Sequence, residues 1–284
     1  MPQPWKTEPM LLLAATPIGN LGDATTRLRT ALAESPVVVA EDTRVAQRLM
    51  AGLGIDAKPR LISMNDHNER ARVDEIVALA ESGDVLVISD AGMPTVSDPG
   101  YRLVAAAIEA GVDLTVLPGP SAVPVALALS GLPTDRFAFE GFLSRKRPER
   151  RSALGALARE PRTLVFFESP QRLGGFLADL ADAFGGDRRV AVCRELTKMF
   201  EEVIRGTAAE LADRFEDGAR GEIVVVVEGA ATVVVDLDEG TRQVLTLTAA
   251  GARLKDAAAE VAAETGLSRR DLYEAALKAA RPGT

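Results

Sequence analysis

The sequence predicts an α/β protein that ends in a small helical segment. Short runs rich in β-branched residues alternate along most of the chain with amphipathic stretches. Most of these runs are apolar throughout, which is typical of strands that helices cover on both faces. Towards the end of the α/β part, the runs 189–196 and 201–205 are separated by only a few residues and indicate a hairpin. We therefore expect a sheet covered on both faces and, later in the chain, one of mixed direction.

Eight runs are expected to be strands: residues 10–15, 37–40, 84–89, 112–117, 137–142, 163–168, 189–194 and 222–228. Two stretches between them carry apolar residues at helical spacing, namely Val73, Ile76, Val77 and Ala80 in the first and Leu103, Val104, Ala107 and Ile108 in the second. Asp98 followed by Pro99 predicts the start of the second helix, as its N-cap and its first helical residue.

The alternation of strands and helices breaks at Pro118-Gly119-Pro120, where we expect a domain boundary. The predicted parts are a flexible tail (1–9), an N-terminal α/β domain (10–118), a C-terminal α/β domain (119–230), a linker (231–245) and a helical domain (246–284). The linker is inferred from the acidic stretch 236–240. Beyond it, apolar faces on both sides of Gly266 predict two helices, and Ser268 with Asp271 resembles a capping box. A helix-turn-helix unit and a helical appendage are both open interpretations.

Composition excludes several classes of protein. The 284 residues are 47% hydrophobic and 26% charged, which is typical of a folded chain of about two domains. The net charge of −8 excludes a general polyanion binder, so any nucleic-acid contact needs a local basic patch. With one cysteine, Cys193, and one histidine, His67, we expect neither a disulfide framework nor a metal site. The longest apolar runs are too short to cross a bilayer and no signal peptide is recognisable, so we expect a cytoplasmic protein.

Loops at the ends of four predicted strands carry residues suited to a ligand site, in segments 16–23, 41–44, 89–100 and 117–122. Each segment has a structural interpretation as well. In the same order, the four are a tight turn, a helix N-cap by Asp42 or Thr43, a crossover loop and a rigid interdomain turn. None of the segments contains G-x-G-x-x-G or a P-loop lysine, so the dinucleotide and nucleoside-triphosphate hypotheses lack their motif.

Nine segments that occur in order resemble one known family. They are TPIGNLGD (16–23), EDTR (41–44), DHNE (66–69), SDAGMP (89–94), SDPGY (97–101), PGPS (118–121), FEGFL (139–143), FESPQR (167–172) and RELTK (194–198). Together they resemble the bacterial small-subunit ribosomal RNA cytidine 2′-O-methyltransferases, a branch of the tetrapyrrole methylase superfamily. The resemblance extends over about residues 11–229. The terminal helices are similar to the small helical domain that many members carry.

The resemblance implies a two-domain, tetrapyrrole-methylase-like (class III methyltransferase) fold that binds S-adenosylmethionine in the cleft between its α/β domains. It also implies a homodimer. The residues that it assigns to the cofactor are Pro17, Asp90, Ala91, Gly92, Val96, Ser97, Ser121, Ala122, Phe142, Leu143 and Glu168. The family usually has threonine or a similar residue where this sequence has Met93.

Methyl transfer to a ribose 2′-hydroxyl needs a base, or a cation that stabilises the developing alkoxide. We favour Lys198 as the cation and Glu195 as the group that orients it, since they are three residues apart just past a strand end. A surface salt bridge is the alternative for this pair. His67 has a suitable ordinary pKa, but it precedes a helix and can equally belong to a cap. Glu41 and Asp42 are further candidates, so the base stays open.

Binding to ribosomal RNA requires cations that contact phosphates. One dense basic run follows the strand 137–142 and consists of Arg145, Lys146, Arg147, Arg150 and Arg151 against a single carboxylate, Glu149. We predict that these residues and Arg44 bind RNA, and Arg269 and Arg270 could add contacts. A solvated helix start is the structural interpretation of the run. Since aromatic residues make up only 4% of the chain, we expect recognition of an assembled ribosomal particle by its shape rather than by base stacking.

Two other functions compete with this one. A methylase of the same superfamily with a tetrapyrrole or a modified histidine as substrate is the nearer alternative, and the basic run argues against it. A DNA-binding ligand sensor that uses the terminal helices is the other, and the near-balanced charge of those helices argues against it. A cofactor-free scaffold is least favoured, because the loops are too elaborate for structure alone.

Overall fold

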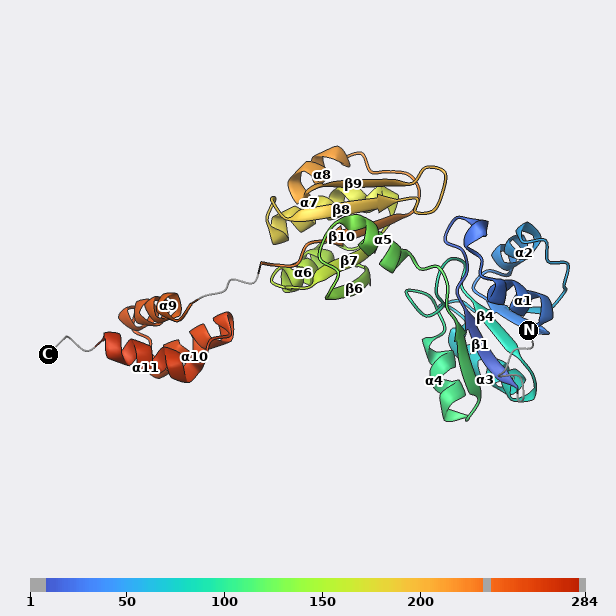
Figure 1. Ribbon diagram of the computed structural model, residues 1–284, viewed down its shortest axis with the longest axis horizontal. Helices are drawn as coiled ribbons and strands as arrows, with labels where there is room; N and C mark the ends of the chain where they lie inside the picture. The colour runs from blue at the N-terminus through green and yellow to red at the C-terminus, as the bar shows by residue number, and fades with distance from the viewer. Residues whose placement is uncertain (1–8, 232–235, 281–284) are drawn as a thin grey trace. The chain divides into compact units, whose positions relative to one another are not determined.

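Two five-stranded sheets form the α/β part of the protein, and three helices form its carboxyl end (Figure 1). The computed structural model describes residues 9–231 and 236–280. All but Pro9 of the predicted tail 1–9, and residues 232–235 of the predicted linker, lie outside the described residues. By its contacts the chain divides into residues 1–229, which hold both sheets, and residues 230–284.

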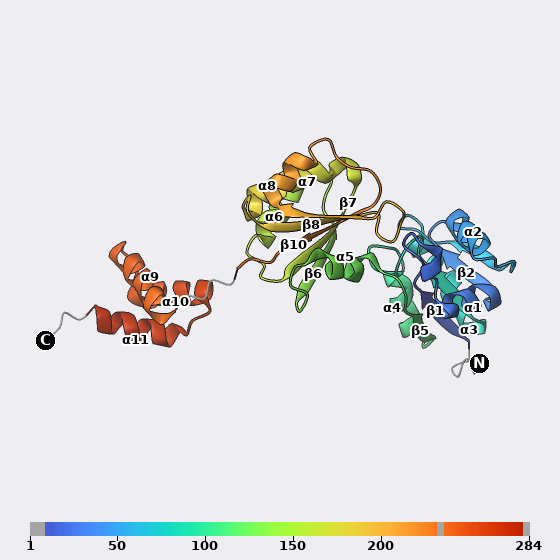
Figure 2. The same ribbon diagram turned by 45° about the horizontal axis from the view of Figure 1, so that its top comes forward.

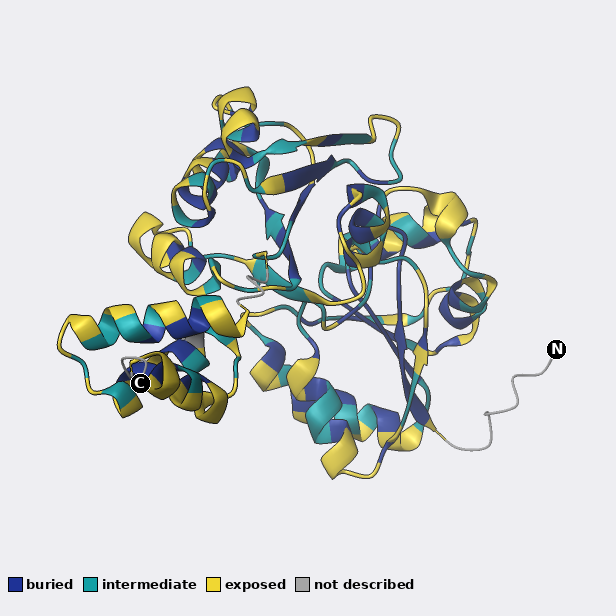
Figure 3. Cartoon of the chain, turned by 60° about the vertical axis from the view of Figure 1, so that its left-hand side comes forward, coloured by how far each residue is buried: buried dark blue, intermediate teal, exposed yellow. Residues whose placement is uncertain are grey.

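The first sheet has the order β3-β2-β4-β1-β5, and all of its strands are parallel (Figure 2). Its elements are β1 (Met10–Ala14), a 3-10 turn (Leu21–Asp23), α1 (Thr26–Glu34), β2 (Val37–Ala40), α2 (Thr43–Gly52), β3 (Arg60–Ser63), α3 (Glu69–Ser82), β4 (Val85–Ile88), α4 (Tyr101–Glu109) and β5 (Asp113–Leu117). Leu12 faces a core with α1 and α2, while its neighbour Leu11 faces a core with α3 and α4. Because both faces are covered, the inner strands are buried except for Val37, the first residue of β2 (Figure 3), as their apolar runs predicted.

The second sheet has the order β6-β7-β10-β8-β9 and is of mixed direction, as predicted. Only β6 and β7 pair in parallel. The elements are α5 (Ala122–Ser130), β6 (Phe137–Phe142), α6 (Arg147–Leu157), β7 (Thr163–Glu168), a 3-10 turn (Pro170–Arg172), α7 (Leu173–Phe184), β8 (Arg189–Arg194), β9 (Glu202–Thr207), α8 (Ala208–Arg214) and β10 (Ile223–Val227). Helices α6, α7 and α8 cover one face and α5 covers the other. Ile18, from the loop after β1, packs into the core under α5 and so joins the two sheets.

The terminal unit contains α9 (Leu237–Ala249), α10 (Leu254–Thr265) and α11 (Arg269–Ala279). Its core consists of Val244, Ala257, Ala258, Val261, Leu272 and Ala276. Gly266 ends α10 in the left-handed conformation, with φ of 73°, and the Ser268 side chain caps α11 by accepting from the backbone N of Asp271. The turn and the cap lie where the sequence predicted them.

Three details of the sequence interpretation are wrong. The predicted linker 231–245 is helical from Leu237, because the acidic stretch is the first turn of α9, where Asp236 caps the helix and carboxylates suit its dipole. Strand β3 was missed, since only Ile62 of its four residues is buried and it carries no apolar run. Asp98 and Pro99 do not start α4, which begins at Tyr101 after Gly100, whose φ of 129° requires glycine.

Candidate active site

A cavity of about 420 Å³ lies where strands of both sheets end. The first sheet and the start of α5 contribute Ile18, Asp90, Ala91, Gly92, Met93, Val96, Ser97, Asp98, Ser121 and Ala122. The second sheet contributes Phe142, Phe167, Glu168, Ser169, Pro170, Leu196, Gly221, Glu222, Ile223 and Val224. The lining is mainly apolar with a few polar groups, which is the usual make-up of a small-molecule site.

Nine of the eleven residues predicted to bind the cofactor line this cavity. They are Asp90, Ala91, Gly92, Val96, Ser97, Ser121, Ala122, Phe142 and Glu168. Pro17 is buried next to the lining residue Ile18, and Leu143 packs against the core under α6 and α7. Sequence reasoning also missed the β10 wall, because the start of a buried apolar strand carries no signal of a site. The cofactor roles themselves stay predictions.

The loop from Asp90 to Gly100 is held in an unusual backbone conformation. Gly92 exchanges two backbone hydrogen bonds with Thr16, of 2.8 and 3.1 Å, and the Ser89 hydroxyl donates to the Gly92 carbonyl. Thr95 and Ser97 adopt φ values of 73° and 62°, which side-chain-bearing residues rarely do. Each such residue costs about 1–3 kcal/mol and persists only where the surroundings enforce it, so this loop is shaped for a purpose other than stability.

Glu69, from the predicted motif DHNE, anchors this loop from behind. Its carboxylate is buried and accepts from the backbone N of Gly100 at 2.9 Å and of Arg102 at 3.2 Å. The Arg102 guanidinium lies 3.5 Å from the other oxygen. No N-cap side chain supports α4, so Glu69 supplies the anion at the positive end of that helix. The motif residue therefore fixes the point where the cavity loop joins α4.

Replacing Glu69 by alanine is expected to destabilise the protein by about 1–3 kcal/mol, because it leaves buried backbone N–H groups without an acceptor. Affinity for S-adenosylmethionine should fall as well, since the loop before Gly100 loses its anchor. Urea denaturation and calorimetric titration measure the two effects. Glu81→Ala is the matched control, because Glu81 is an exposed residue of α3, the helix that also carries Glu69. It should leave the stability and the affinity unchanged. Equal behaviour of the two variants would contradict the anchoring role.

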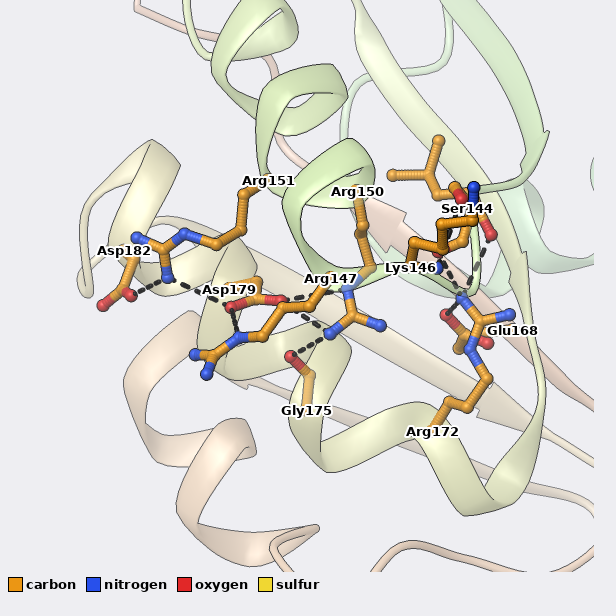
Figure 4. A network of polar contacts seen from close by, with 11 residues as sticks. Ser144, Lys146, Arg147, Arg150, Arg151, Glu168, Arg172, Gly175, Asp179 and Asp182 are labelled. Carbon is orange, nitrogen blue, oxygen red and sulfur yellow. Dashed lines mark hydrogen bonds and ion pairs between the residues drawn. The ribbon is translucent and has the colours of Figure 1, made fainter.

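Glu168, at the end of β7, is a buried carboxylate on the cavity wall, with no exposed side-chain surface. Its Oε1 accepts from the backbone N of Ser169 at 2.7 Å. Its Oε2 lies 3.2 Å from Arg172, yet accepts no hydrogen bond from any described residue. Arg172 instead donates to the carbonyls of Leu143 and Ser144 (Figure 4). A buried oxygen with a free lone pair beside a cavity indicates a ligand that donates a hydrogen bond there.

Lys198 and Glu195 lie together at the edge of the cavity. The Lys198 ammonium is 2.8 Å from Glu195 and 3.1 Å from Glu222, and Glu222 lines the cavity. Burial lowers the pKa of Lys198, but hydrogen bonds to Glu195 and Glu222 outweigh it, so the pKa stays above its ordinary value. The hydrogen bond from Lys198 lowers the pKa of Glu195. Both groups are therefore charged at neutral pH, and a protonated Lys198 has no lone pair with which to accept a proton. The stem of Lys198 packs on Gly19, where a Cβ would lie 2.4 Å from it.

His67 lies elsewhere. With Glu41, Asp42, Thr43, Arg44, Ser63 and Asn65 it lines a second cavity of about 500 Å³, which shares Asp90 with the first. Asp42 caps α2 by accepting from the backbone N of Arg44 at 2.8 Å. The helix after His67, α3, has Asn68 at its N-cap position and no side-chain cap, so His67 does not cap it. The catalytic role of His67 stays a prediction. Among the described residues, no group of three or more histidine, cysteine, aspartate or glutamate side chains is placed to hold a metal ion.

Carboxylates that line the two cavities have raised pKa values. Burial, followed by the charges of Asp90, Asp98 and Asp66, raises the pKa of Glu41 from its ordinary 4.5 to about 7. Burial, then Asp90 and Asp66, raises the pKa of Asp98 to about 6 despite a hydrogen bond from Ser89. Such crowding of acids destabilises a fold and is typical of functional sites.

Glu41→Gln is expected to stabilise the protein at pH 8 by about 1–2 kcal/mol, allowing for screening of this half-buried group. The unfolded chain ionises Glu41 near its ordinary pKa of 4.5, whereas the folded chain keeps the proton up to about pH 7. Stability therefore falls as the pH rises between these values, and the variant removes that loss. Urea denaturation at pH 4 and pH 8 measures it. A gain of the same size at pH 4 would refute this explanation, and Glu81→Gln serves as the control.

Three of the five cations in the basic run predicted to bind RNA pair with one buried carboxylate. Asp179 of α7, with no exposed side-chain surface, pairs with three arginines of α6: Arg147 at 2.9 Å, Arg150 at 2.6 Å and Arg151 at 3.1 Å (Figure 4). The Arg150 side chain is only 8% exposed, so its predicted contact with RNA is wrong. The arginines crowd the first turns of α6, where cations are unfavourable, and the buried carboxylate compensates for them.

The other predicted RNA-binding cations are more accessible. Arg147 and Arg151 keep exposed surface beside their ion pairs, and Lys146 pairs with exposed Glu149 at 3.0 Å. Arg44 is exposed and pairs with its neighbour Asp42 at 2.6 Å. Arg145 is exposed and forms no ion pair with any described residue. The RNA contacts of these five residues stay predictions.

Comparison with known proteins agrees with this architecture. Residues 10–212 match the family model of the tetrapyrrole (corrin/porphyrin) methylases, and residues 235–280 match the RsmI C-terminal HTH domain. The chain is similar to the ribosomal RNA small subunit methyltransferase I of Mycobacterium bovis, with 52% identity over 95% of each chain. The protein of that name from Escherichia coli O157:H7 is 41% identical over 94% of each chain.

Among solved structures, the fold resembles a uroporphyrin-III C-methyl transferase from Thermus thermophilus complexed with S-adenyl homocysteine. The TM-score is 0.53 at 21% sequence identity, over 77% of this chain and 96% of that one. No helix in the described parts of the chain has the length and apolar character to cross a membrane. The fold, the order of the motifs and the extent of these matches lead to one conclusion: the chain belongs to the tetrapyrrole methylase family.

Proposed function

We propose that this protein transfers a methyl group from S-adenosylmethionine to the 2′-hydroxyl of a cytidine ribose in small-subunit ribosomal RNA. Its relatives with 41–52% identity over nearly their whole length carry the name ribosomal RNA small subunit methyltransferase I. The observation that carries the proposal is the charged Lys198 at the rim of an apolar cavity, held between Glu195 and Glu222. A cation in that place suits a reaction in which an alkoxide develops.

The residues around the cavity fit S-adenosylmethionine. The cavity volume of about 420 Å³ lies within the range of small-molecule sites. Oε2 of buried Glu168, which accepts no hydrogen bond from the described residues, suits a hydrogen-bond donor of the ligand. The loop residues Asp90–Gly92 bring backbone groups to the cavity wall. Apolar side chains such as Phe142, Leu196 and Ile18 exclude water from the reacting groups. When bound, S-adenosylmethionine supplies the methyl group on a positively charged sulfonium.

Lys198 and the two glutamates would act on the ribose. Because Lys198 stays protonated, its ammonium donates to the 2′-oxygen and stabilises the negative charge that develops there. Oε1 of Glu195 accepts from Lys198 and from the backbone N of Glu222, so Glu195 orients the ammonium. Glu222 is largely exposed and lies 3.1 Å from the ammonium, which makes it the better placed acceptor of the hydroxyl proton. Its contact with solvent provides the path by which the proton leaves.

The alternatives receive less support. A uroporphyrin methylase shares this fold at only 21% identity, whereas the relatives named for ribosomal RNA reach 52%. For a DNA-binding sensor, the match of residues 235–280 to an HTH domain is the favourable observation. We assign the terminal helices a part in RNA docking instead, since the tetrapyrrole methylase match covers most of the chain.

The proposed phosphate contacts are the exposed cations Arg44, Arg145 and Lys146, together with the exposed parts of Arg147 and Arg151. We also propose a homodimer that acts in the cytoplasm, where ribosomes are made. Exposed Tyr101 and Ile108 on α4, and Val116 on the edge strand β5, support a contact between copies. Sedimentation at micromolar concentration should give the mass of a dimer.

Radiolabelled S-adenosylmethionine mixed with the protein and small ribosomal subunits tests the activity. The subunits should come from cells that lack the gene, and naked ribosomal RNA serves as a second substrate. We expect label in the RNA at one linkage that resists alkali, because a methylated 2′-oxygen can no longer attack its phosphate. Absence of label from both substrates, with cofactor binding intact, would contradict the RNA function and favour another substrate for the same site.

A further inference from the structure

The loop between β8 and β9 exposes two large apolar side chains directly after Lys198. Met199 is 91% exposed and Phe200 is 68% exposed, and Met199 has the highest exposure of the large apolar side chains that the structure describes. Exposed apolar surface is unfavourable in water, so a pair of this kind beside a candidate active site indicates a contact surface.

The exposure does not result from a loose loop. The backbone N of Thr197 donates to the Glu201 carboxylate at 2.6 Å, and the backbone N of Glu201 donates to the Lys198 carbonyl at 3.1 Å. Leu196 is buried in the core under α5. Glu195 and Thr197 adopt left-handed φ values of 52° and 67°, a costly conformation that the hydrogen bonds hold in place. The loop therefore presents Met199 and Phe200 in a fixed position.

The position of the pair limits its partner. The Cα of Phe200 can lie at most about 7.6 Å from that of Lys198, because two peptide units separate them. A nucleic-acid strand that meets the Lys198 ammonium therefore passes close to the loop that carries Phe200. Two side chains are too small for the ~1,200 Å² or more that a stable protein interface buries, but they match the face of one nucleobase.

We propose that Phe200, supported by Met199, stacks on a base of the RNA next to the ribose that meets Lys198. The proposal rests on the RNA function proposed above and names the means by which the strand is held there. Stacking on an aromatic ring requires an unpaired base, so the target ribose would lie in a single-stranded or opened segment. The scarcity of aromatic residues had favoured recognition by shape alone, and Phe200 adds a stacking contact to it.

A fluorescent reporter tests the contact directly. Trp5 is the only tryptophan of the chain, so Trp5→Phe combined with Phe200→Trp places one tryptophan on the loop. Titration with naked small-subunit ribosomal RNA should quench its emission. The matched control is Trp5→Phe with Phe137→Trp, since Phe137 is also exposed but starts β6, whose other end reaches the cavity at Phe142. Equal quenching of both reporters, or quenching that follows protein concentration without RNA, would overturn the proposal; the latter would indicate a second copy of the chain on this surface.

Kinetics provide the second test. Phe200→Ala should raise KM for RNA about tenfold while kcat and the affinity for S-adenosylmethionine change less than twofold. Phe200→Trp should retain the low KM. If wild type methylates RNA and Phe200→Ala keeps its KM, the stacking proposal fails and the function stands. If wild type methylates no RNA, the function fails and the stacking proposal fails with it.

Discussion

Replacing Lys198 by methionine is expected to lower kcat for RNA methylation by about 10²–10³, the usual cost of removing one group that stabilises a developing oxyanion. Methionine keeps most of the side-chain volume that packs on Gly19 but removes the charge. Because Lys198 does not line the cavity itself, the affinity for S-adenosylmethionine should change little. Single-turnover transfer of radiolabel to small ribosomal subunits gives the rate, and calorimetry gives the affinity.

Two further variants make this result specific. Lys278→Met, at an exposed position on α11, removes a charge elsewhere and should leave kcat unchanged. Glu195→Gln keeps a hydrogen-bond acceptor for Lys198 but loses its charge, so a smaller decrease in kcat is expected. A Lys198→Met enzyme with kcat within threefold of wild type would show that the ammonium is only part of a salt bridge. That was the structural alternative for this pair.

Arg150→Ala is expected to destabilise the protein by about 2–3 kcal/mol. A buried charge left without any partner costs about 3–5 kcal/mol, but here Arg147 and Arg151 still pair with Asp179. The carboxylate of Asp179 would lose its closest cation, at 2.6 Å, and stay buried. Arg150 also donates to the carbonyl of Gly175, so α6 and α7 would lose two contacts at once. Urea denaturation at pH 7 measures the change, with an unchanged slope required for the comparison.

Arg145→Ala is the matched control from the same basic run, and should change stability by less than about 0.5 kcal/mol because the side chain is exposed. For RNA affinity we expect the opposite order: Arg145→Ala should weaken RNA binding more than Arg150→Ala does, and the difference from wild type should shrink as the salt concentration rises. If Arg150→Ala folds with normal stability and loses RNA affinity, the run is an RNA site as the sequence suggested. If stability falls instead, the run is mainly the link between α6 and α7.

Several features of the fold follow from local patterns. The inner strands are recognisable because both faces are buried, which requires continuous apolar runs such as Ile223–Val227. Glycine at 266 and the Ser268 cap also depend on neighbouring residues only. Strand β3 was not predicted because only one of its residues is buried, so it has no apolar run. The start of α9 was not predicted because its first turn is acidic, which suits a helix end but resembles a linker.

In the candidate site too, some residues were predictable from local sequence and others were not. The resemblance of short motifs to a known family pointed to nine of the residues that line the cavity, because such motifs are continuous in the chain. No local pattern indicates that Glu222, at the start of an apolar strand, lies 3.1 Å from Lys198, or that Glu69 anchors Gly100 from 31 positions earlier. Those contacts arise only when β8 pairs with β10 and α3 packs on α4.

The basic run 145–151 shows most clearly the difference between what the sequence and what the structure reveals. Five cations within seven residues are visible in the sequence, and so is their excess over local carboxylates. That Asp179, 29 positions after Arg150, pairs with three of them is visible only in the structure. The sequence by itself therefore determined the fold class, the family and the location of the cavity, since these depend on periodicity and on motifs that are continuous in the chain. The tertiary structure decided which charges face solvent and which face each other, because the fate of a charge depends on the partner that folding brings to it.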